Sequence, residues 1–370
     1  MRLSPSFLLL AVAMAAASCG NADRPTSVIL IIGDGAGVAY WTAASFASDN
    51  PAFKQFPVVG LVETESADST ITDSGAAATA LASGIRTFNG AIGVDSDTNT
   101  VPTVLEAAQQ QGMATGLVVT STITHATPAA FAAHVPDRYM DREIARQLAE
   151  SDVDVLLGGG RRYFDPVSRG DGVDLLAAMT TEYHVVLAPD EFHSVNTDSV
   201  SKLVGLFASR HMPEVYSRSP SLPEMTTTAI EVLDKDPDGF FLMVEGSQPD
   251  FRGEDNSTLD SLTAEMLDLD RAIWVALDYQ RSHPSTLIVV VADHEAGGLA
   301  LQHAMPADPD YVEVPEDDPA GRLPLVARYT TGGHTATMVP LFASGPGAER
   351  FGGIQDNWEI GRLLLETVRR

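Results

Sequence analysis

Short runs of consecutive apolar residues recur along the chain, and they limit its fold more than any other feature. The first run, Ser27 to Ile32, is followed by Gly33-Asp34-Gly35. An apolar run without polar alternation is typical of a strand buried on both faces, as in a parallel sheet. The pattern recurs at Gly116 to Thr120, Val153 to Leu157, Phe240 to Val244, Thr286 to Val291 and Met338 to Ala343. The sequence therefore predicts a large, mostly parallel central sheet.

Helix-like stretches separate these runs, namely Val104 to Gln111, Asp141 to Glu150 and Ser261 to Gln280. Alternating strands and helices imply crossover connections and an α/β fold, a three-layer helix–sheet–helix sandwich. No linker divides the chain, so we predict one domain over residues 27–370. A small surface insertion is expected at about residues 300–330, where Asp308 to Pro319 is acidic and contains prolines.

The first residues are typical of an export signal. Met1-Arg2-Leu3 carries a positive charge, Phe7 to Ala17 is apolar, and small residues follow. This pattern predicts a signal peptide over residues 1–18 and a short tether over residues 19–26. Ala16-Ala17-Ser18-Cys19 resembles the bacterial lipoprotein cleavage box, so we expect an exported protein, periplasmic or at the cell surface, with a lipid on Cys19. The alternative is ordinary signal cleavage near Ala17, with Cys19 incidental.

Charge and cysteine content exclude several classes of function. The formal net charge is −27, which makes the chain a poor binder of nucleic acid and of anionic membrane surfaces. Membrane association is therefore expected only through a lipid on Cys19. Because Cys19 is the only cysteine, the chain has no internal disulfide and no cysteine-based zinc site.

Polar residues follow several of the predicted strands at the point where each strand ends. Asp34 follows the first strand, His125 follows the second, Glu245 follows the run at Phe240 to Val244, and Asp293-His294 follows the run at Thr286 to Val291. Ligands bind beyond the carboxyl ends of the strands in open parallel sheets. A mixture of Asp, Glu and His at that edge indicates a divalent metal site.

Ser74 begins an alanine-rich stretch that predicts a helix, with Gly84 as its stop. The free N–H groups at a helix start favour an anion, so a serine oxygen there is suited to act as an alkoxide and to carry a phosphoryl group. The alternative is that Ser74 is only an N-cap, which is the commonest role of serine at this position.

Seven short segments, taken together and in their order along the chain, resemble the motifs of a known protein family. They are Ile32-Gly33-Asp34-Gly35, Thr72-Asp73-Ser74-Gly75-Ala76-Ala77-Ala78-Thr79-Ala80, Phe88-Asn89-Gly90-Ala91-Ile92-Gly93-Val94-Asp95, His125-Ala126-Thr127-Pro128, Val244-Glu245-Gly246-Ser247-Gln248, Ala292-Asp293-His294-Glu295 and Gly333-His334-Thr335. Together they resemble the alkaline phosphatase family, from about Ser27 to about Gly353. The resemblance implies an alkaline phosphatase-like fold that hydrolyses phosphate monoesters through a phosphoserine, with two zinc ions and one magnesium ion.

The resemblance also implies roles for individual residues. Ser74 matches the nucleophile. Arg138 matches the arginine that grips the substrate phosphate, and Asp73 matches a position that orients this arginine. Small phosphorylated molecules are the implied substrates, and homodimers are common in the family.

Metal ligands follow from the same resemblance. Asp34 matches the carboxylate shared by the second zinc and the magnesium, and Asp293 and His294 match the other ligands of that zinc. The remaining matches are Thr127 and Glu245 for magnesium, His125 acting on the magnesium through water, and Asp250 and His334 for the first zinc.

The chain departs from the family at the first zinc site. Glu254 stands where a histidine is expected four residues after Asp250. A carboxylate can bind zinc, but this harder ligand set shifts affinity towards manganese, magnesium or calcium. His303 is a candidate to replace the missing ligand. Two other functions stay open: phosphodiester hydrolysis, and a catalytically weakened surface lipoprotein that binds metal or phosphate.

Overall fold

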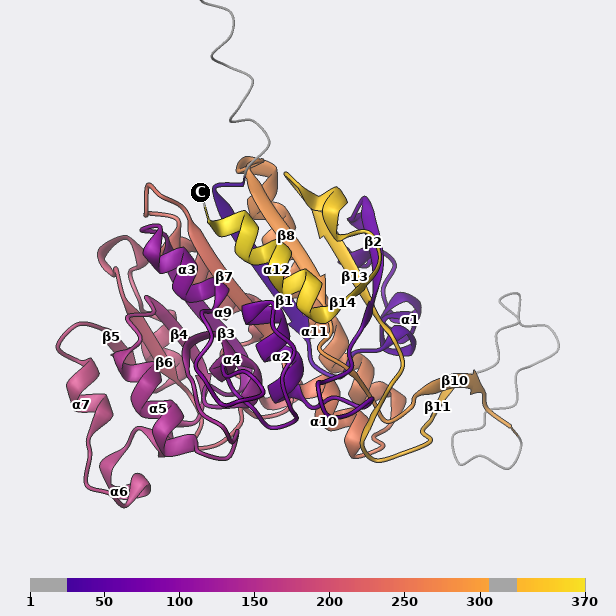
Figure 1. The fold of residues 1–370 in the computed structure, drawn as a ribbon, viewed down its shortest axis with the longest axis horizontal. Coiled ribbons are helices and arrows are strands. Elements are labelled where there is room, and N and C mark those ends of the chain that lie inside the picture. The colour runs from indigo at the N-terminus through magenta and orange to yellow at the C-terminus, as the bar shows by residue number, and fades with distance from the viewer. Residues whose placement is uncertain (1–24, 306–324, 370) are drawn as a thin grey trace, which may run out of the picture.

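A computed structural model describes residues 25–305 and 325–369 of the chain, which form a sheet of ten strands with helices on both faces (Figure 1). The strand order is β14-β2-β13-β8-β1-β7-β3-β4-β6-β5. The strands are β1 (Ser27–Gly33), β2 (Val58–Glu63), β3 (Ala114–Thr122), β4 (Val155–Gly159), β5 (His184–Val186), β6 (Leu203–Leu206), β7 (Phe240–Gly246), β8 (Thr286–Val291), β13 (Val339–Ser344) and β14 (Gly353–Asp356). The predicted α/β fold is confirmed.

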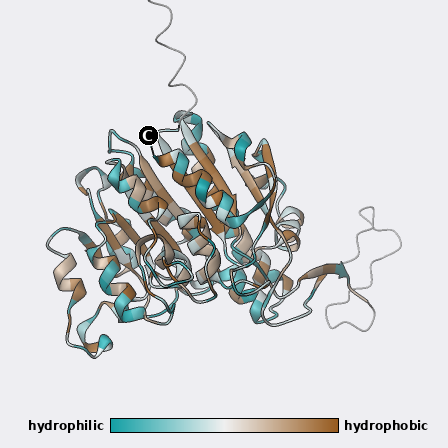
Figure 2. Cartoon of the chain, in the orientation of Figure 1, coloured by the Kyte–Doolittle hydropathy of each residue, from teal (hydrophilic) through white to brown (hydrophobic). Residues whose placement is uncertain are grey.

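The centre of the sheet explains why the apolar runs are continuous. β1 pairs in parallel with β7 on one side and β8 on the other, and all its residues are buried. β13 is the exception to the parallel arrangement, because it pairs antiparallel with both β8 and β2. Figure 2 shows the apolar residues concentrated on these strands and polar residues on the outer helices.

Two helical layers cover the sheet. Helices α2, α3, α4 and α12 pack against one another on one face, and α9 and α11 pack together on the other. The helices are α1 (Val38–Ala47), α2 (Ser74–Ser83), α3 (Val104–Gln110), α4 (Ala126–Ala132), α5 (Asp141–Glu150), α6 (Pro166–Arg169), α7 (Leu175–Met179), α8 (Pro189–His193), α9 (Leu222–Leu233), α10 (Gln248–Glu254), α11 (Leu259–Ser282) and α12 (Asn357–Val368). Within the described ranges, no helix has the length and apolar character needed to cross a bilayer.

Two small antiparallel ladders lie outside the main sheet. β9 (Glu295–Ala296) pairs with β12 (His334–Thr335), and β10 (Ala300–His303) pairs with β11 (Leu325–Arg328). The second ladder falls within the predicted insertion at residues 300–330. Asp308 to Pro319, the signal peptide at residues 1–18 and Cys19 lie outside the described residues.

A buried ionic cluster attaches the segment that precedes α9 to helix α11. Arg218 is 2.6 Å from Glu265 Oε2 and 2.8 Å from Asp268 Oδ2, and the three side chains are 1–2% exposed. Glu265 also accepts a hydrogen bond from the Val215 backbone N–H. Because all three charges are removed from water, their mutual pairing is required for the segment to stay in place.

We expect Arg218→Met to lower the free energy of unfolding by about 3–5 kcal/mol, because it leaves Glu265 buried without a cation and Asp268 with only the half-exposed Arg271, 3.3 Å away, as its partner. Arg281→Met is the control: Arg281 pairs with Asp278 at the surface, where an ion pair contributes about 1 kcal/mol or less. Urea denaturation of both variants measures the difference. Equal losses in the two variants would contradict this account of the cluster.

Candidate active site

The carboxyl ends of the central strands bring the predicted metal ligands together. Three groups of side chains each place their ligand atoms within 4.8 Å of one another. The groups are Asp34, Asp293 and His294; Asp250, His294 and His334; and Asp34, His125 and Glu245. Asp34 and His294 each belong to two groups, so the three form one continuous cluster.

The first group is fully buried and contains the nucleophile candidate at its edge. His294 Nε2 lies 3.3 Å from Asp34 Oδ1 and 3.3 Å from Asp293 Oδ2. The same nitrogen is 3.3 Å from Ser74 Oγ. A cation held by these three ligands would therefore lie beside the Ser74 hydroxyl.

Helix α2 places Ser74 at this position. Asp73 is the N-cap, accepting a hydrogen bond from the Ala76 N–H at 2.9 Å, and Ser74 is the first helical residue. The alternative in which Ser74 itself is the N-cap is therefore wrong. Gly84 ends the helix in the left-handed conformation, with φ of 69°, as the sequence predicts.

Arg138 lies beside the first turn of α2. Its Nη1 donates to Asp73 Oδ2 at 2.7 Å, and its Nη2 lies 3.2 Å from His125 Nε2. The Arg138 backbone N–H donates to the Gly90 carbonyl at 2.8 Å, which fixes the loop. Burial raises the pKa of Asp73, but Arg138 and two backbone N–H donors outweigh this effect and lower it overall. Asp73 thus stays ionised and orients the guanidinium.

Glu254, which stands where the family has a histidine, lies next to the group of Asp250, His294 and His334. His334 Nε2 lies 3.7 Å from Asp250 Oδ1 and 3.4 Å from Glu254 Oε1. Nδ1 lies 2.8 Å from the Thr72 carbonyl, which can only accept, so Nδ1 carries a proton and Nε2 faces the two acids. Glu254 is 43% exposed and lies outside the three groups, although it reaches His334.

The third group consists of the buried Asp34 and Glu245 and the partly buried His125. Thr127, at the start of α4, is buried beside it, and its Oγ1 has no hydrogen-bond partner. Both oxygens of Glu245 are likewise buried and unpartnered. A ring nitrogen of His125 lies within 4.8 Å of the ligand atoms of Asp34 and Glu245, which brings His125 to the predicted magnesium position.

Unpartnered oxygens are concentrated in this cluster. Among the described residues, buried oxygens without a hydrogen bond include both of Asp34 and one each of Asp250 and Asp293. Burial is the largest cause that raises the pKa of these three acids, and it raises the pKa of Glu245 to about 8. Buried carboxylates this close together are stabilised either by protons or by bound cations, and their oxygens are ligands that suit divalent metal ions, so the residues present fit such ions.

We expect the metal-free protein to lose stability as the pH rises from about 4.5 to about 8. The folded-state pKa of Glu245, about 8, is above its unfolded value, so the folded state binds the extra proton in this window. The stabilisation is complete below the unfolded pKa and is lost as pH passes the folded pKa. Thermal unfolding in a chelator across this range measures the effect, and a rising midpoint would contradict it. Added Zn²⁺ and Mg²⁺ should reduce the loss.

Sequence reasoning missed two neighbours of the site. The ring centroids of His211 and Phe251 lie 5.6 Å and 6.0 Å from that of His125, and 4.9 Å from each other. His211 lies in a loop after β6 with no local motif, so no sequence signal could have placed it here. His303, the proposed replacement ligand, is exposed on β10 and belongs to none of the three groups.

Comparisons with known proteins agree with this geometry. The family model for alkaline phosphatase matches residues 26–316. Alkaline phosphatase 3 of Bacillus subtilis is 35% identical, with 95% of this chain and 90% of the relative covered. Streptomycin-6-phosphate phosphatase of Streptomyces griseus is 32% identical, with 97% and 94% covered.

Solved structures give the same result. Alkaline phosphatase from the Antarctic bacterium TAB5 has a TM-score of 0.84 at 37% identity, with 94% of this chain and 98% of that chain covered. The Thermus thermophilus enzyme has a TM-score of 0.83 at 27% identity, with 98% and 96% covered. A single-site variant of the TAB5 enzyme holds Mg in its M3 site. The chain therefore belongs to the alkaline phosphatase family and is a phosphoric monoester hydrolase.

Proposed function

We propose that the chain hydrolyses phosphate monoesters through a covalent phosphoserine at Ser74. The observation that carries the proposal is the position of the Ser74 hydroxyl, 3.3 Å from His294 and at the start of a ten-residue helix. The N-terminus of α2 favours the negative charge of an alkoxide and of a bound phosphoryl group. The buried carboxylates beside it supply ligands for cations.

The reaction is proposed to run in two displacements. Ser74 Oγ loses its proton and attacks phosphorus, the bond from phosphorus to the leaving oxygen breaks, and the leaving oxygen takes up one proton and departs as an alcohol. Water then attacks the phosphorus of the phosphoserine, and the bond to Ser74 Oγ breaks to release inorganic phosphate and restore the hydroxyl. A covalent intermediate of this kind divides one difficult step into two easier ones.

Arg138 is proposed to hold the substrate phosphate. A guanidinium offers parallel N–H donors to two phosphate oxygens, which an ammonium cannot do. Asp73 keeps one edge of the Arg138 guanidinium occupied, at 2.7 Å, so the orientation of the group is set before the substrate arrives. Asp73 is therefore a positioning residue.

Three metal ions complete the proposal. The second zinc would be held by Asp34, Asp293 and His294, and the first-site ion by Asp250, Glu254 and His334. Magnesium would be held by Asp34, Thr127 and Glu245, with His125 beside it. When bound, such ions lower the pKa of the attacking hydroxyl or water and stabilise the leaving oxygen. The Mg in a variant of the TAB5 enzyme supports the magnesium assignment.

We expect Glu254→His to preserve or raise zinc-dependent activity, because a neutral nitrogen ligand suits zinc better than a second carboxylate at this site. The zinc-to-manganese ratio of affinities should rise by about tenfold or more. Titrations with zinc and with manganese, monitored through enzyme activity and bound-metal content, measure the change in activity and the change in the affinity ratio. A collapse of activity in E254H would mean that the carboxylate is integral to this version of the site.

The rate on an aryl phosphate compared with its diester tests the proposed function. We expect the monoester to be the preferred substrate of the purified protein with added zinc and magnesium. A preference for the diester would favour the phosphodiesterase alternative, and no turnover with zinc, magnesium or manganese would favour the weakened lipoprotein. Export through residues 1–18, a lipid on Cys19 and a homodimer remain proposals that this assay does not address.

A further inference from the structure

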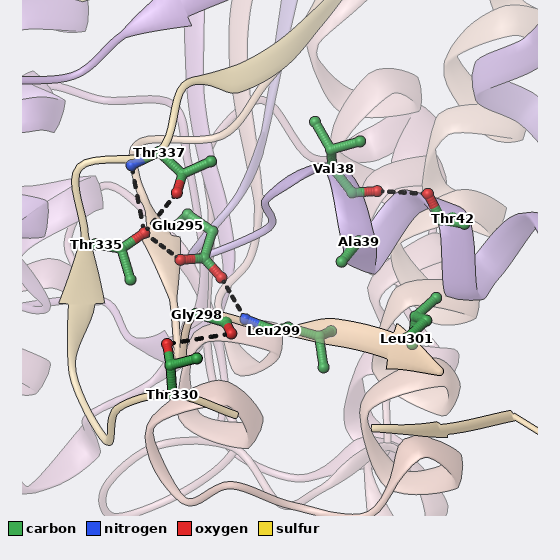
Figure 3. Close-up of a pocket in the computed structure, with 10 residues that line it drawn as sticks. All are labelled: Val38, Ala39, Thr42, Glu295, Gly298, Leu299, Leu301, Thr330, Thr335 and Thr337. Atoms are coloured by element: carbon green, nitrogen blue, oxygen red, sulfur yellow. Dashed lines mark hydrogen bonds between the residues drawn. The ribbon is translucent and has the colours of Figure 1, made fainter. Parts of the chain in front are cut away.

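A cavity lies beside the β9–β12 ladder, whose strand β12 carries His334 of the metal site. It has a volume of about 560 Å³ and lies between the start of α1 and the segment from β9 to β10 (Figure 3). One side of the cavity is apolar, formed by Val38, Ala39 and Leu301, and Val38 is 50% exposed. Glu295 and Thr335 form the polar side. We refer to it as the Glu295 pocket.

Glu295 is buried without a counter-ion. It is 4% exposed, and none of the described residues forms an ion pair with it. One carboxylate oxygen accepts from the Leu299 N–H at 3.0 Å and the other accepts from the Thr335 hydroxyl (Figure 3). Each oxygen keeps a free lone pair. The start of α1 offers partial positive charge at most, so a buried carboxylate here still favours a cation.

The size of the pocket indicates the kind of cation. Its volume falls within the range typical of small-molecule sites, and Glu295 belongs to none of the metal-compatible groups among the described residues. An ammonium group facing Glu295 would leave room for an apolar body against Val38 and Leu301. A bare metal ion would find one carboxylate and no second acidic ligand.

The pocket shares its wall with the metal site. His334 and Thr335 are successive residues of β12, and Thr335 pairs with Glu295 across the ladder while His334 pairs with Ala296. Successive side chains of a strand point to opposite faces. His294 and His334 therefore stack on one side, with centroids 3.5 Å apart, while Glu295 and Thr335 line the pocket on the other.

We propose that the Glu295 pocket binds a small organic cation, a protonated primary amine on an apolar body, and that its occupancy is coupled to metal binding through the Glu295–Thr335 pair. The binding rests on the pocket alone, whereas the coupling also rests on the proposed metal site. Coupling of this kind is reciprocal: the amine changes metal affinity by the same factor as the metal changes amine affinity.

Titration of the purified protein with benzylammonium at neutral pH, followed by NMR, tests the binding without reference to activity. We expect saturable binding, with benzyl alcohol, its uncharged counterpart, binding at least about tenfold more weakly. Glu295→Gln should lower the benzylammonium affinity by at least about tenfold, since it removes the full charge. Ala39→Leu should do the same by filling the pocket from α1, without changing the ladder.

Glu254→Gln is the matched control, since it removes a carboxylate at the mouth of the metal site instead. With the metals removed by a chelator, so that coupling to metal binding plays no part, it should leave benzylammonium binding unchanged. The binding proposal is overturned if benzylammonium shows no saturable binding or if benzyl alcohol binds equally well. It is also overturned if E254Q loses benzylammonium affinity while E295Q does not. For the coupling, saturating benzylammonium should change zinc affinity by at least about fivefold. Equal zinc affinities with and without the amine overturn it.

Discussion

Ser74→Ala should reduce phosphate monoester turnover by at least about 1,000-fold while the protein stays folded. Removing a covalent nucleophile removes the pathway itself, and the remaining groups retain only a small part of the rate enhancement. Ser74 is buried at the start of α2, and its Oγ contacts His294 at 3.3 Å. Initial rates on an aryl phosphate, with circular dichroism to check the fold, measure both parts of the expectation.

Ser83→Ala is the matched control for this variant. Ser83 is also buried and lies on the same helix, but its hydroxyl donates to the Thr79 carbonyl at the opposite end of α2 from the site. We expect its turnover to stay within about twofold of the unchanged protein. Retained full activity in S74A would remove Ser74 from the mechanism, whatever the control shows.

Asp34→Asn should have the second largest effect, because Asp34 belongs to two of the three metal-compatible groups. We expect a loss of bound metal at both groups and a fall in turnover of at least about 1,000-fold. Burial, followed by the charges of neighbouring acids, raises the pKa of Asp34 in the metal-free fold. A neutral amide removes that repulsion, so the metal-free variant should unfold at a higher temperature than the unchanged protein at pH 8.

The same variant should gain less stability when metals are added. A ligand that binds only the folded state stabilises it by about 2.7 kcal/mol at a concentration of 100 times its Kd, and D34N would lose this gain at two groups. Asp270→Asn is the control, because Asp270 is also buried but accepts from the Ala52 N–H, away from the cluster. Normal metal content in D34N would contradict the shared role of Asp34.

The sequence predicts the centre of the sheet better than its edges. β1, β7 and β8 are buried on both faces, so their apolar runs are continuous and recognisable. β2, which lies next to the edge strand β14, alternates buried and exposed residues, and the sequence analysis does not identify it as a strand. The antiparallel direction of β13 was also not predictable, because a buried run has the same composition in either direction.

Some residues of the candidate site could be predicted from the strand pattern, and others could not. Asp34, Glu245 and Asp293 follow predicted strands, so topology alone places them at one edge of the sheet. Arg138 and Asp250 needed the family resemblance, since neither directly follows a strand. The Thr72 carbonyl that fixes the tautomer of His334 could not be predicted, because backbone contacts between distant loops leave no sequence pattern.

Acid-quench labelling tests the central claim most directly. The protein is mixed with a phosphate monoester that carries an isotopic label on phosphorus, the reaction is stopped in acid within one turnover, and the peptides are analysed by mass spectrometry. The account predicts labelled phosphate on the peptide that contains Ser74, and none in S74A. Hydrolysis of the substrate with no label on Ser74, or with label on another residue, would contradict it.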